Sequence, residues 1–249
     1  MHRHLLDANR ADLALMVGAF NHSATSLARR AQYVWEVAEY GDAWGAAYDA
    51  KYGFGVGKAM GMIAATTSGG WSAPIQWYLK AAALRNVKKL RLDAKYDAFV
   101  LTRPDFYYAC DLDVGALLDQ SASAVWVPQG EDYDGLNDRV AVVRGARDLD
   151  VLLDLVPCIL KPEPGGQEKI WDAEGRYMDC LKHGGVLDRV QRFPNVQFTV
   201  AADGDSTRWQ QAKGRIRAGV KLKYRNEYTG AMKTCRETAR ADPLLSLVP

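Results

Sequence analysis

Two short apolar runs, each followed by acidic residues, carry the side chains best suited to chemistry. The first run, 98–101, leads into Arg103-Pro104-Asp105, and the second, 124–127, leads into 128–139, which holds Asp138 and three other carboxylates. In open α/β sheets, ligands bind just beyond the carboxyl ends of the strands. Carboxylate oxygens there suit hard cations such as Mg²⁺ or Mn²⁺, which often bridge to phosphates. The pattern therefore predicts a cation site and a substrate that carries phosphate.

The composition is that of an ordinary globular protein, but its charge is unevenly distributed. The 249 residues suffice for one large domain or two small ones, and 48% are hydrophobic and 25% charged. Acidic residues dominate 97–138, whereas 208–240 holds ten Lys and Arg residues against two Glu. We therefore expect a cation site in the first region and an anion site in the second.

The cysteines and the apolar segments indicate the expected location of the protein in the cell. The four cysteines are widely separated and form no Cys-x-x-Cys pair, which argues against a zinc site or a disulfide framework and favours a reducing compartment. No apolar run approaches the roughly 18–20 residues that span a membrane, and the first residues lack the apolar core of a signal peptide. The expectation is a cytoplasmic protein without a membrane span.

Strand-like and helix-like segments alternate along the chain. We expect a strand at 13–20, a helix near 26–40, and short strands or a loop in the glycine-rich segment 41–75. The later expected elements are a helix or turn at 114–118, helices at 75–92, 146–155 and 167–183, strands at 98–101, 124–127, 140–143 and 196–200, and a partly helical basic tail. This alternation predicts an α/β fold with a mainly parallel central sheet flanked by helices.

Three sequence motifs together resemble a known family. They are Tyr-Asp followed five residues later by Arg-Pro-Asp at 96–105, then Trp-Val-Pro and Gly-Leu-Asn-Asp-Arg within 126–139, and Trp-Asp-Ala-Glu at 171–174. The combination is similar to small nucleotide-sugar glycosyltransferases of the GT-A fold, found in large DNA viruses of algae and in cellular polysaccharide pathways. The resemblance covers roughly residues 13–209. It implies one Rossmann-like transferase domain over 1–249 with a basic, partly helical segment at 208–249, in the host cytoplasm if the protein is viral.

The resemblance also implies roles for particular residues on the donor side. Asp105 would replace the usual Asp-x-Asp motif as the ligand of Mn²⁺ or Mg²⁺, with Arg103 beside the donor. Only one carboxylate stands where that motif has two, and the literal Asp111-Leu112-Asp113 lies beyond the strand end, so we interpret it as a decoy. Arg208 belongs to the basic tail, which would help to neutralise the leaving diphosphate.

On the acceptor side, Asn137 and Arg139 would line the cleft. Four aromatic side chains would offer flat faces to sugar rings: Trp126, Tyr133, Trp171 and Trp209. Sugar transfer builds positive charge at the anomeric carbon and negative charge on the diphosphate, which a metal ion or Arg and Lys side chains can neutralise. An inverting enzyme also needs a carboxylate that takes the proton of the acceptor hydroxyl, an effect of about 10²–10⁴-fold. Glu174 and Asp138 are the candidates for this base.

Two other functions remain open at this stage. A metal-dependent phosphoesterase or nucleotidyltransferase would use the same acidic strand ends, but usually gathers several carboxylates on a pair of cations. A nucleic-acid binding module would work through 208–240, although the net charge of +2 is small and recognisable binding motifs are absent. The expected partners of the leading hypothesis are a nucleotide sugar and a glycan acceptor. The sugar, the acceptor and the stereochemistry stay open, although a lone carboxylate base favours inversion.

Overall fold

The computed structural model describes residues 14–18, 32–38, 40–66, 70–103, 105–121, 123–161, 173–202, 214–217 and 219–237. The strands are β1 (Ala14–Gly18), β2 (Tyr33–Val37), β3 (Ala98–Leu101), β4 (Phe106–Tyr108), β5 (Val125–Pro128), β6 (Ala141–Arg144), β7 (Val190–Phe193), β8 (Gln197–Ala202), β9 (Arg215–Arg217) and β10 (Val220–Leu222). The α-helices are α1 (Trp44–Tyr52), α2 (Val56–Thr66), α3 (Ser72–Lys89), α4 (Leu92–Lys95), α5 (Val114–Gln120), α6 (Ala146–Leu153), α7 (Val156–Ile159), α8 (Ala173–His183) and α9 (Arg225–Glu237).

The central sheet has the strand order β3-β6-β5-β7 and mixed directions. Strands β3 and β5 are both antiparallel to β6, and β5 is parallel to β7. The chain is therefore α/β, but the prediction of a mainly parallel sheet is wrong. Strand β6 follows β5 through a loop without a crossover helix, and such a connection returns the chain antiparallel. Strands β3, β5 and β7 nevertheless all run in one direction.

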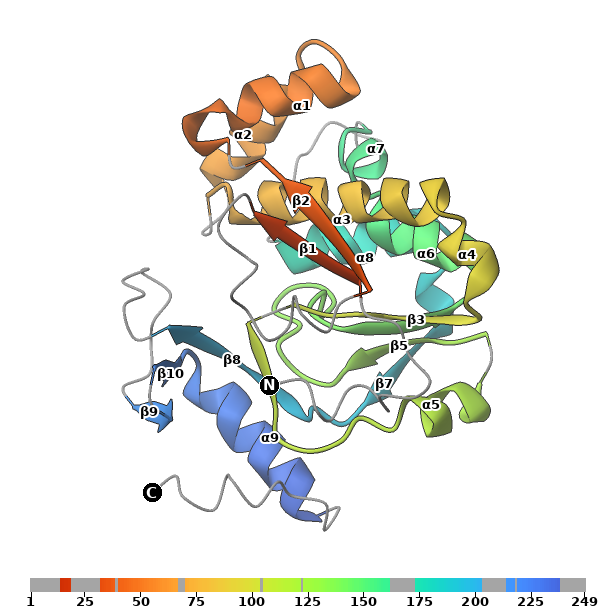
Figure 1. Cartoon of the computed structure of the whole chain (residues 1–249), viewed down its shortest axis with the longest axis vertical. Coiled ribbons are helices and arrows are strands. Elements are labelled where there is room, and N and C mark those ends of the chain that lie inside the picture. Colours follow the sequence, from red (N-terminus) through yellow and green to blue (C-terminus); the bar gives the residue numbers. More distant parts are fainter. Residues whose placement is uncertain are drawn as a thin grey trace.

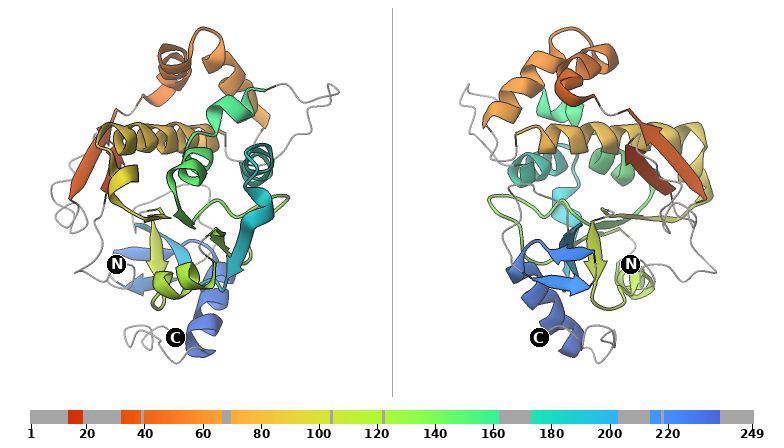
Figure 2. Two further views of the ribbon diagram at one scale, coloured as in Figure 1. Left: turned by 90° about the vertical axis from the view of Figure 1, so that its right-hand side faces the viewer. Right: turned by 60° about the vertical axis from the view of Figure 1, so that its left-hand side comes forward.

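A second sheet, of order β4-β8-β10-β9, is antiparallel throughout, and β1 pairs in parallel with β2. Helices α3, α6 and α8 cover one face of the central sheet, while α5, the second sheet and α9 lie on the other side (Figures 1 and 2). Side chains alternate along a strand. Val125 and Val127 of β5 accordingly face the helical core, whereas Ala124 and Trp126 join the core shared with the second sheet.

The expected elements of the second half are largely confirmed. The strands predicted at 98–101, 124–127, 140–143 and 196–200 are β3, β5, β6 and β8, and the helices predicted at 75–92 and 146–155 are α3 and α6. Helix α8 occupies the described part of 167–183. It ends at Gly184-Gly185, where Gly185 takes φ +67° and the Val186 N–H donates to the Leu181 carbonyl, as in a glycine-terminated helix.

The predictions for the N-terminal part of the chain are only partly confirmed. Strand β1 confirms the predicted first strand, but 33–37 forms strand β2 where a helix was expected, and 26–31 lies outside the described residues. In the glycine-rich segment 41–75, the described residues 41–66 and 70–75 are mostly helical, whereas strands or a loop were expected. A Cβ on Gly57 would lie 2.0 Å from the Gly45 carbonyl oxygen. The glycines therefore allow the backbones of α1 and α2 to approach closely. In the sequence, glycines that serve such a contact cannot be told from glycines of a loop.

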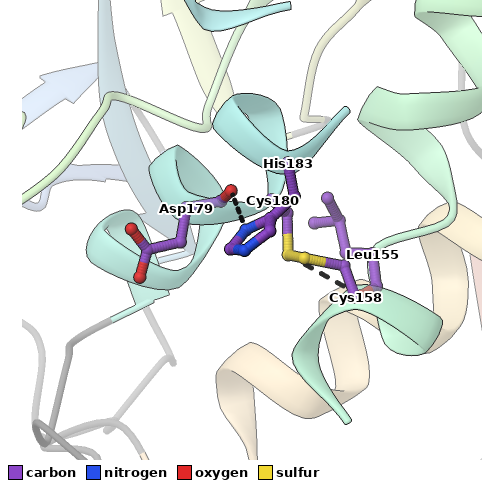
Figure 3. The surroundings of a disulfide bond; sticks show 5 residues. All are labelled: Leu155, Cys158, Asp179, Cys180 and His183. Carbon is purple, nitrogen blue, oxygen red and sulfur yellow. Dashed lines mark hydrogen bonds between the residues drawn. A yellow bond between two sulfur atoms is a disulfide. The ribbon is translucent and has the colours of Figure 1, made fainter. Parts of the chain in front are cut away.

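The prediction of a chain without a disulfide framework is also wrong. Cys110, just after β4, is bonded to Cys235 of α9, and Cys158 of α7 is bonded to Cys180 of α8 (Figure 3). The partners are 125 and 22 residues apart in the sequence. Packing of distant elements brings them together, and the spacing of cysteines does not report such packing. Among the described residues, no helix is long and apolar enough to cross a membrane.

The loop between β5 and β6 is fixed to the elements around it. Asp132 Oδ1 accepts from the Asn137 N–H at 2.9 Å and from Arg192 Nη1 at 2.7 Å. The Leu136 N–H donates to the Glu174 carbonyl at 3.2 Å, which joins the loop to the start of α8. Beside this bond, a Cβ on Gly135 would lie 2.1 Å from the Glu174 carbonyl carbon. The loop can reach α8 only because residue 135 has no side chain.

Replacing this glycine tests that contact. Gly135→Ala should lower the free energy of unfolding by about 2–3 kcal/mol, because the atoms it meets are backbone and cannot rotate away. The matched control is Gly115→Ala in α5, where a Cβ would meet Asp113 Oδ1 at an ordinary 3.5 Å and helix propensity favours alanine. Urea denaturation of both variants measures the difference. Equal stability of the two variants would contradict the contact.

Candidate functional site

Three ion pairs gather at the carboxyl edge of β3 and β5. These two strands run in the same direction, so the chain leaving β3 and the loop leaving β5 emerge at the same edge of the sheet. Helices α3, α8 and α9 supply further side chains there. The three ion pairs, here called the charge cluster, are Lys80–Asp138, Arg103–Asp105 and Arg139–Glu227.

Asp138 lies at the centre of the charge cluster. Its side chain is 7% exposed, and Lys80 Nζ of α3 lies 3.1 Å from its Oδ2 and 3.3 Å from its carbonyl oxygen. Burial alone would raise the pKa of this carboxyl, but Lys80, Arg103 and Arg139 outweigh burial and lower the pKa below its usual range. Asp138 is therefore an anion at neutral pH.

The pair Arg103–Asp105 is the most exposed part of the charge cluster. Arg103 Nε donates to Asp105 Oδ1 at 3.0 Å and Nη2 donates to Oδ2 at 2.8 Å, and the side chains are 31% and 30% exposed. This two-point contact fixes the plane of the guanidinium. The Asp105 carbonyl accepts from the Val200 N–H at 2.9 Å, which ties the segment to β8.

The third pair joins the loop to α9. Glu227 is 3% exposed, and its carboxylate accepts from Arg139 Nη1 and, at 2.7 Å each, from the backbone N–H and Oγ1 of Thr199 in β8. The Arg139 guanidinium also lies 5.6 Å from the Tyr224 ring centroid. The helix in the basic tail thus contributes a buried acid that positions Arg139.

The other predicted site residues occupy different environments. Asn137 is 2% exposed, and its side-chain amide donates to the Gly130 carbonyl at 2.8 Å and accepts from the Arg139 N–H at 3.1 Å. Trp126 is 6% exposed in the second core, and its Nε1 is buried without a hydrogen-bond partner. Glu174 is half-buried in the first turn of α8. Arg208 lies outside the described residues.

The structure therefore brings together Arg103, Asp105, Asp138 and Arg139. The backbone carbonyl of Glu174 bonds Leu136 of the same loop. The side chains of Asn137 and Trp126 are occupied with the loop and the core. Sequence reasoning missed Lys80 and Glu227. A signal existed for Glu227, which is one of only two acids in the basic segment 208–240. Nothing comparable marks Lys80 among the other lysines.

The hydrogen bonds of Asp105 bear on the metal ion predicted at this residue. Both of its carboxylate oxygens accept hydrogen bonds from Arg103, so a divalent cation there would lie against a guanidinium. Within the described ranges, no group of three or more His, Cys, Asp or Glu side chains could hold a metal ion. Asp113 of the literal Asp-x-Asp caps helix α5, where its Oδ1 accepts from the Ala116 N–H at 3.0 Å.

No protein-family model matches the sequence, and comparisons with curated proteins and with solved structures find no significant match.

Asp138 provides a test of the charge cluster. Asp138→Asn should lower the free energy of unfolding at pH 7 by about 2–4 kcal/mol, because it leaves Lys80 without its largely buried partner. The folded-state pKa of Asp138 is lowered, so its contribution is present above the unfolded value of about 3.9 and is lost as the pH falls through the folded value. The difference between wild type and variant should therefore shrink below about pH 4.

Urea denaturation between pH 3 and pH 8 measures this dependence. The control is Asp93→Asn, which removes one carboxylate from the more exposed contacts of Lys88 with Asp93 and Asp150. Its effect at pH 7 should be the smaller of the two, since exposed ion pairs are screened by solvent. A pH-independent loss in Asp138→Asn would exclude an ionised Asp138 as its cause.

Proposed function

We propose that the chain is a glycosyltransferase that moves a sugar from a nucleotide-sugar donor to a hydroxyl group of a glycan acceptor. The observation that supports this best is the convergence of three cationic side chains and their carboxylate partners at the common carboxyl edge of β3 and β5. Sugar transfer from a nucleoside diphosphate sugar needs positive and negative side chains at one place. Cations neutralise the leaving diphosphate, and a carboxylate takes the proton of the acceptor hydroxyl. The motifs at 96–105 and 126–139 point to the same activity.

On the donor side, the leaving diphosphate would meet the guanidinium of Arg103. This side chain keeps about a third of its surface exposed, and its contact with Asp105 leaves other N–H groups for a second anion. Lys80 and Arg139 are less exposed, at 19% and 11%. The Mn²⁺ or Mg²⁺ expected from the sequence stays a prediction, and no step of the proposed reaction passes through it.

On the acceptor side, Glu174 suits the role of base better than Asp138. A general base works best when its pKa lies near the working pH, whereas the pKa of Asp138 is lowered and Lys80 occupies its Oδ2. Asp138 would then hold Lys80 and Arg103 in place. Glu174 is half-buried at the start of α8, beside the loop that carries Asp138.

No specific observation favours a phosphoesterase, a nucleotidyltransferase or a nucleic-acid binding module. These functions become outcomes of a binding screen. Nucleotide sugars, free nucleotides and oligonucleotides are compared by the rise in melting temperature that each produces, since a ligand that binds only the native state stabilises it. A rise with oligonucleotides alone would contradict the proposed transferase.

Two substitutions test the roles of the carboxylates. Asp105→Ala should leave the fold intact but remove most nucleotide release from the donor, because Arg103 loses the partner that orients it.

Glu174→Gln should retain donor affinity and lower turnover by about 10²-fold or more, even at saturating acceptor, since proton transfer belongs to the transition state. Asp93→Asn, which removes a carboxylate of a more exposed ion pair outside the charge cluster, is the control. If Asp138→Asn lost turnover with normal donor affinity while Glu174→Gln retained turnover, the base would be Asp138.

Chelation of metals tests the donor side. Because the charge cluster supplies cations but no group of metal ligands, the rise in melting temperature caused by a nucleoside diphosphate should persist in EDTA. Calorimetric titration with and without Mn²⁺ provides the affinities. Binding that requires Mn²⁺ would support the metal role predicted for Asp105 from the sequence and would show that Arg103 releases this carboxylate.

A further inference from the structure

The loop between β5 and β6, next to the charge cluster, contains two non-glycine residues with an unfavourable backbone conformation. Glu131 has φ +55° and Tyr133 has φ +49°, in the left-handed region that residues with a side chain rarely adopt. Arg91, at φ 53°, is the only other non-glycine residue with positive φ in the described part of the chain. Unfavourable backbone is thus concentrated at the edge of the sheet where the charge cluster lies.

Tyr133 also exposes its ring instead of burying it. The residue is 59% exposed, and its hydroxyl donates to Glu131 Oε2 at 2.8 Å. Partial burial of the hydroxyl and its bond to Glu131, with the charge of Glu174 nearby, raise the pKa of Tyr133 to about 12, so the phenol is neutral. An exposed ring on an unfavourable backbone stabilises the folded chain little. Such residues cluster where a ligand is held.

The groups around the ring indicate the kind of ligand. Glu131 places carboxylate oxygens, which accept hydrogen bonds, beside Tyr133, and the Arg139 guanidinium lies 6.0 Å from the ring centroid. The charge of Glu174 also acts on Tyr133. Arg139 is already paired with Glu227, so a phosphate at the ring would face two carboxylates with little free positive charge. A neutral sugar fits better, because its C–H face packs on an aromatic ring while its hydroxyls donate to carboxylates.

We propose that Tyr133 is the platform on which a neutral sugar ring of the acceptor packs, with Glu131 and Glu174 as acceptors of hydrogen bonds from its hydroxyls. This inference rests on the proposed transferase function and places the acceptor on the Tyr133 side of the charge cluster. It also places the acceptor hydroxyls beside Glu174, the proposed base.

Because Tyr133 has a positive φ, glycine is the most informative substitution at this position. Tyr133→Gly removes the ring and supplies the residue best suited to positive φ, so it should raise the melting temperature by about 2–4 °C. The same variant should weaken sugar binding at least tenfold, whereas Tyr133→Phe, which retains the ring, should stay within about threefold of wild type. The matched control is Arg91→Gly, which relieves the same conformation between α3 and α4 and should gain stability without a change in sugar binding.

Binding is measured on the full chain by saturation-transfer NMR and titration with methyl glycosides of glucose, galactose, mannose, xylose and fucose, and with uridine and guanosine. Sugar binding that Tyr133→Gly abolishes and Arg91→Gly preserves supports the platform. Three results overturn it: no glycoside binds the wild type, Tyr133→Gly binds as well as wild type, or the nucleosides and not the glycosides depend on the ring. Nucleotide release by the wild type tests the transferase separately, so failure of one proposal is distinguishable from failure of the other.

Discussion

The buried carboxylate of Asp138 is the constraint on which the site depends. A charge removed from water costs several kcal/mol unless cations and hydrogen bonds compensate it. Lys80, Arg103 and Arg139 provide that compensation, and they come from helix α3, from the chain after β3 and from the loop itself. Because all three must stay close to one carboxylate, the helix, the strand end and the loop cannot move independently. The same interaction that stabilises the edge of the sheet therefore fixes the geometry of the proposed donor site.

A second set of contacts joins the loop between β5 and β6 to the elements of the second core. Glu227 of α9 bonds Arg139 from one side and Thr199 of β8 from the other, and the disulfide between Cys110 and Cys235 ties the same helix to the end of β4. The helix that the sequence marked only as basic thus acts through a buried acid. Its position follows from β8 and β4, so the antiparallel sheet supports the site although Asp105 and Asp138 lie at the edge of the other sheet.

The loop between β5 and β6 combines contacts that stabilise its conformation with a residue that folding does not favour. Gly135 is needed for contact with α8, and Asn137 and Asp132 close the loop on itself and on Arg192. Those contacts stabilise one conformation. Tyr133, in the same loop, has an unfavourable φ and an exposed ring, which folding alone would not select. A rigid loop that carries one strained aromatic residue is well suited to present that ring to a ligand without a cost of ordering at the moment of binding.

The sequence by itself determined the local features: apolar runs that end at Arg103-Pro104-Asp105 and before Asp138, and the helical periodicity of α3 and α6. These patterns report burial and backbone preference over a few residues. The tertiary structure alone decided the partners, because Lys80 lies 58 residues from Asp138, Glu227 lies 88 residues from Arg139, and the cysteines of one disulfide are 125 residues apart. It also decided the direction of β6 and the burial of Trp126. Such contacts depend on how whole layers pack, and packing between distant segments leaves no local pattern in the chain.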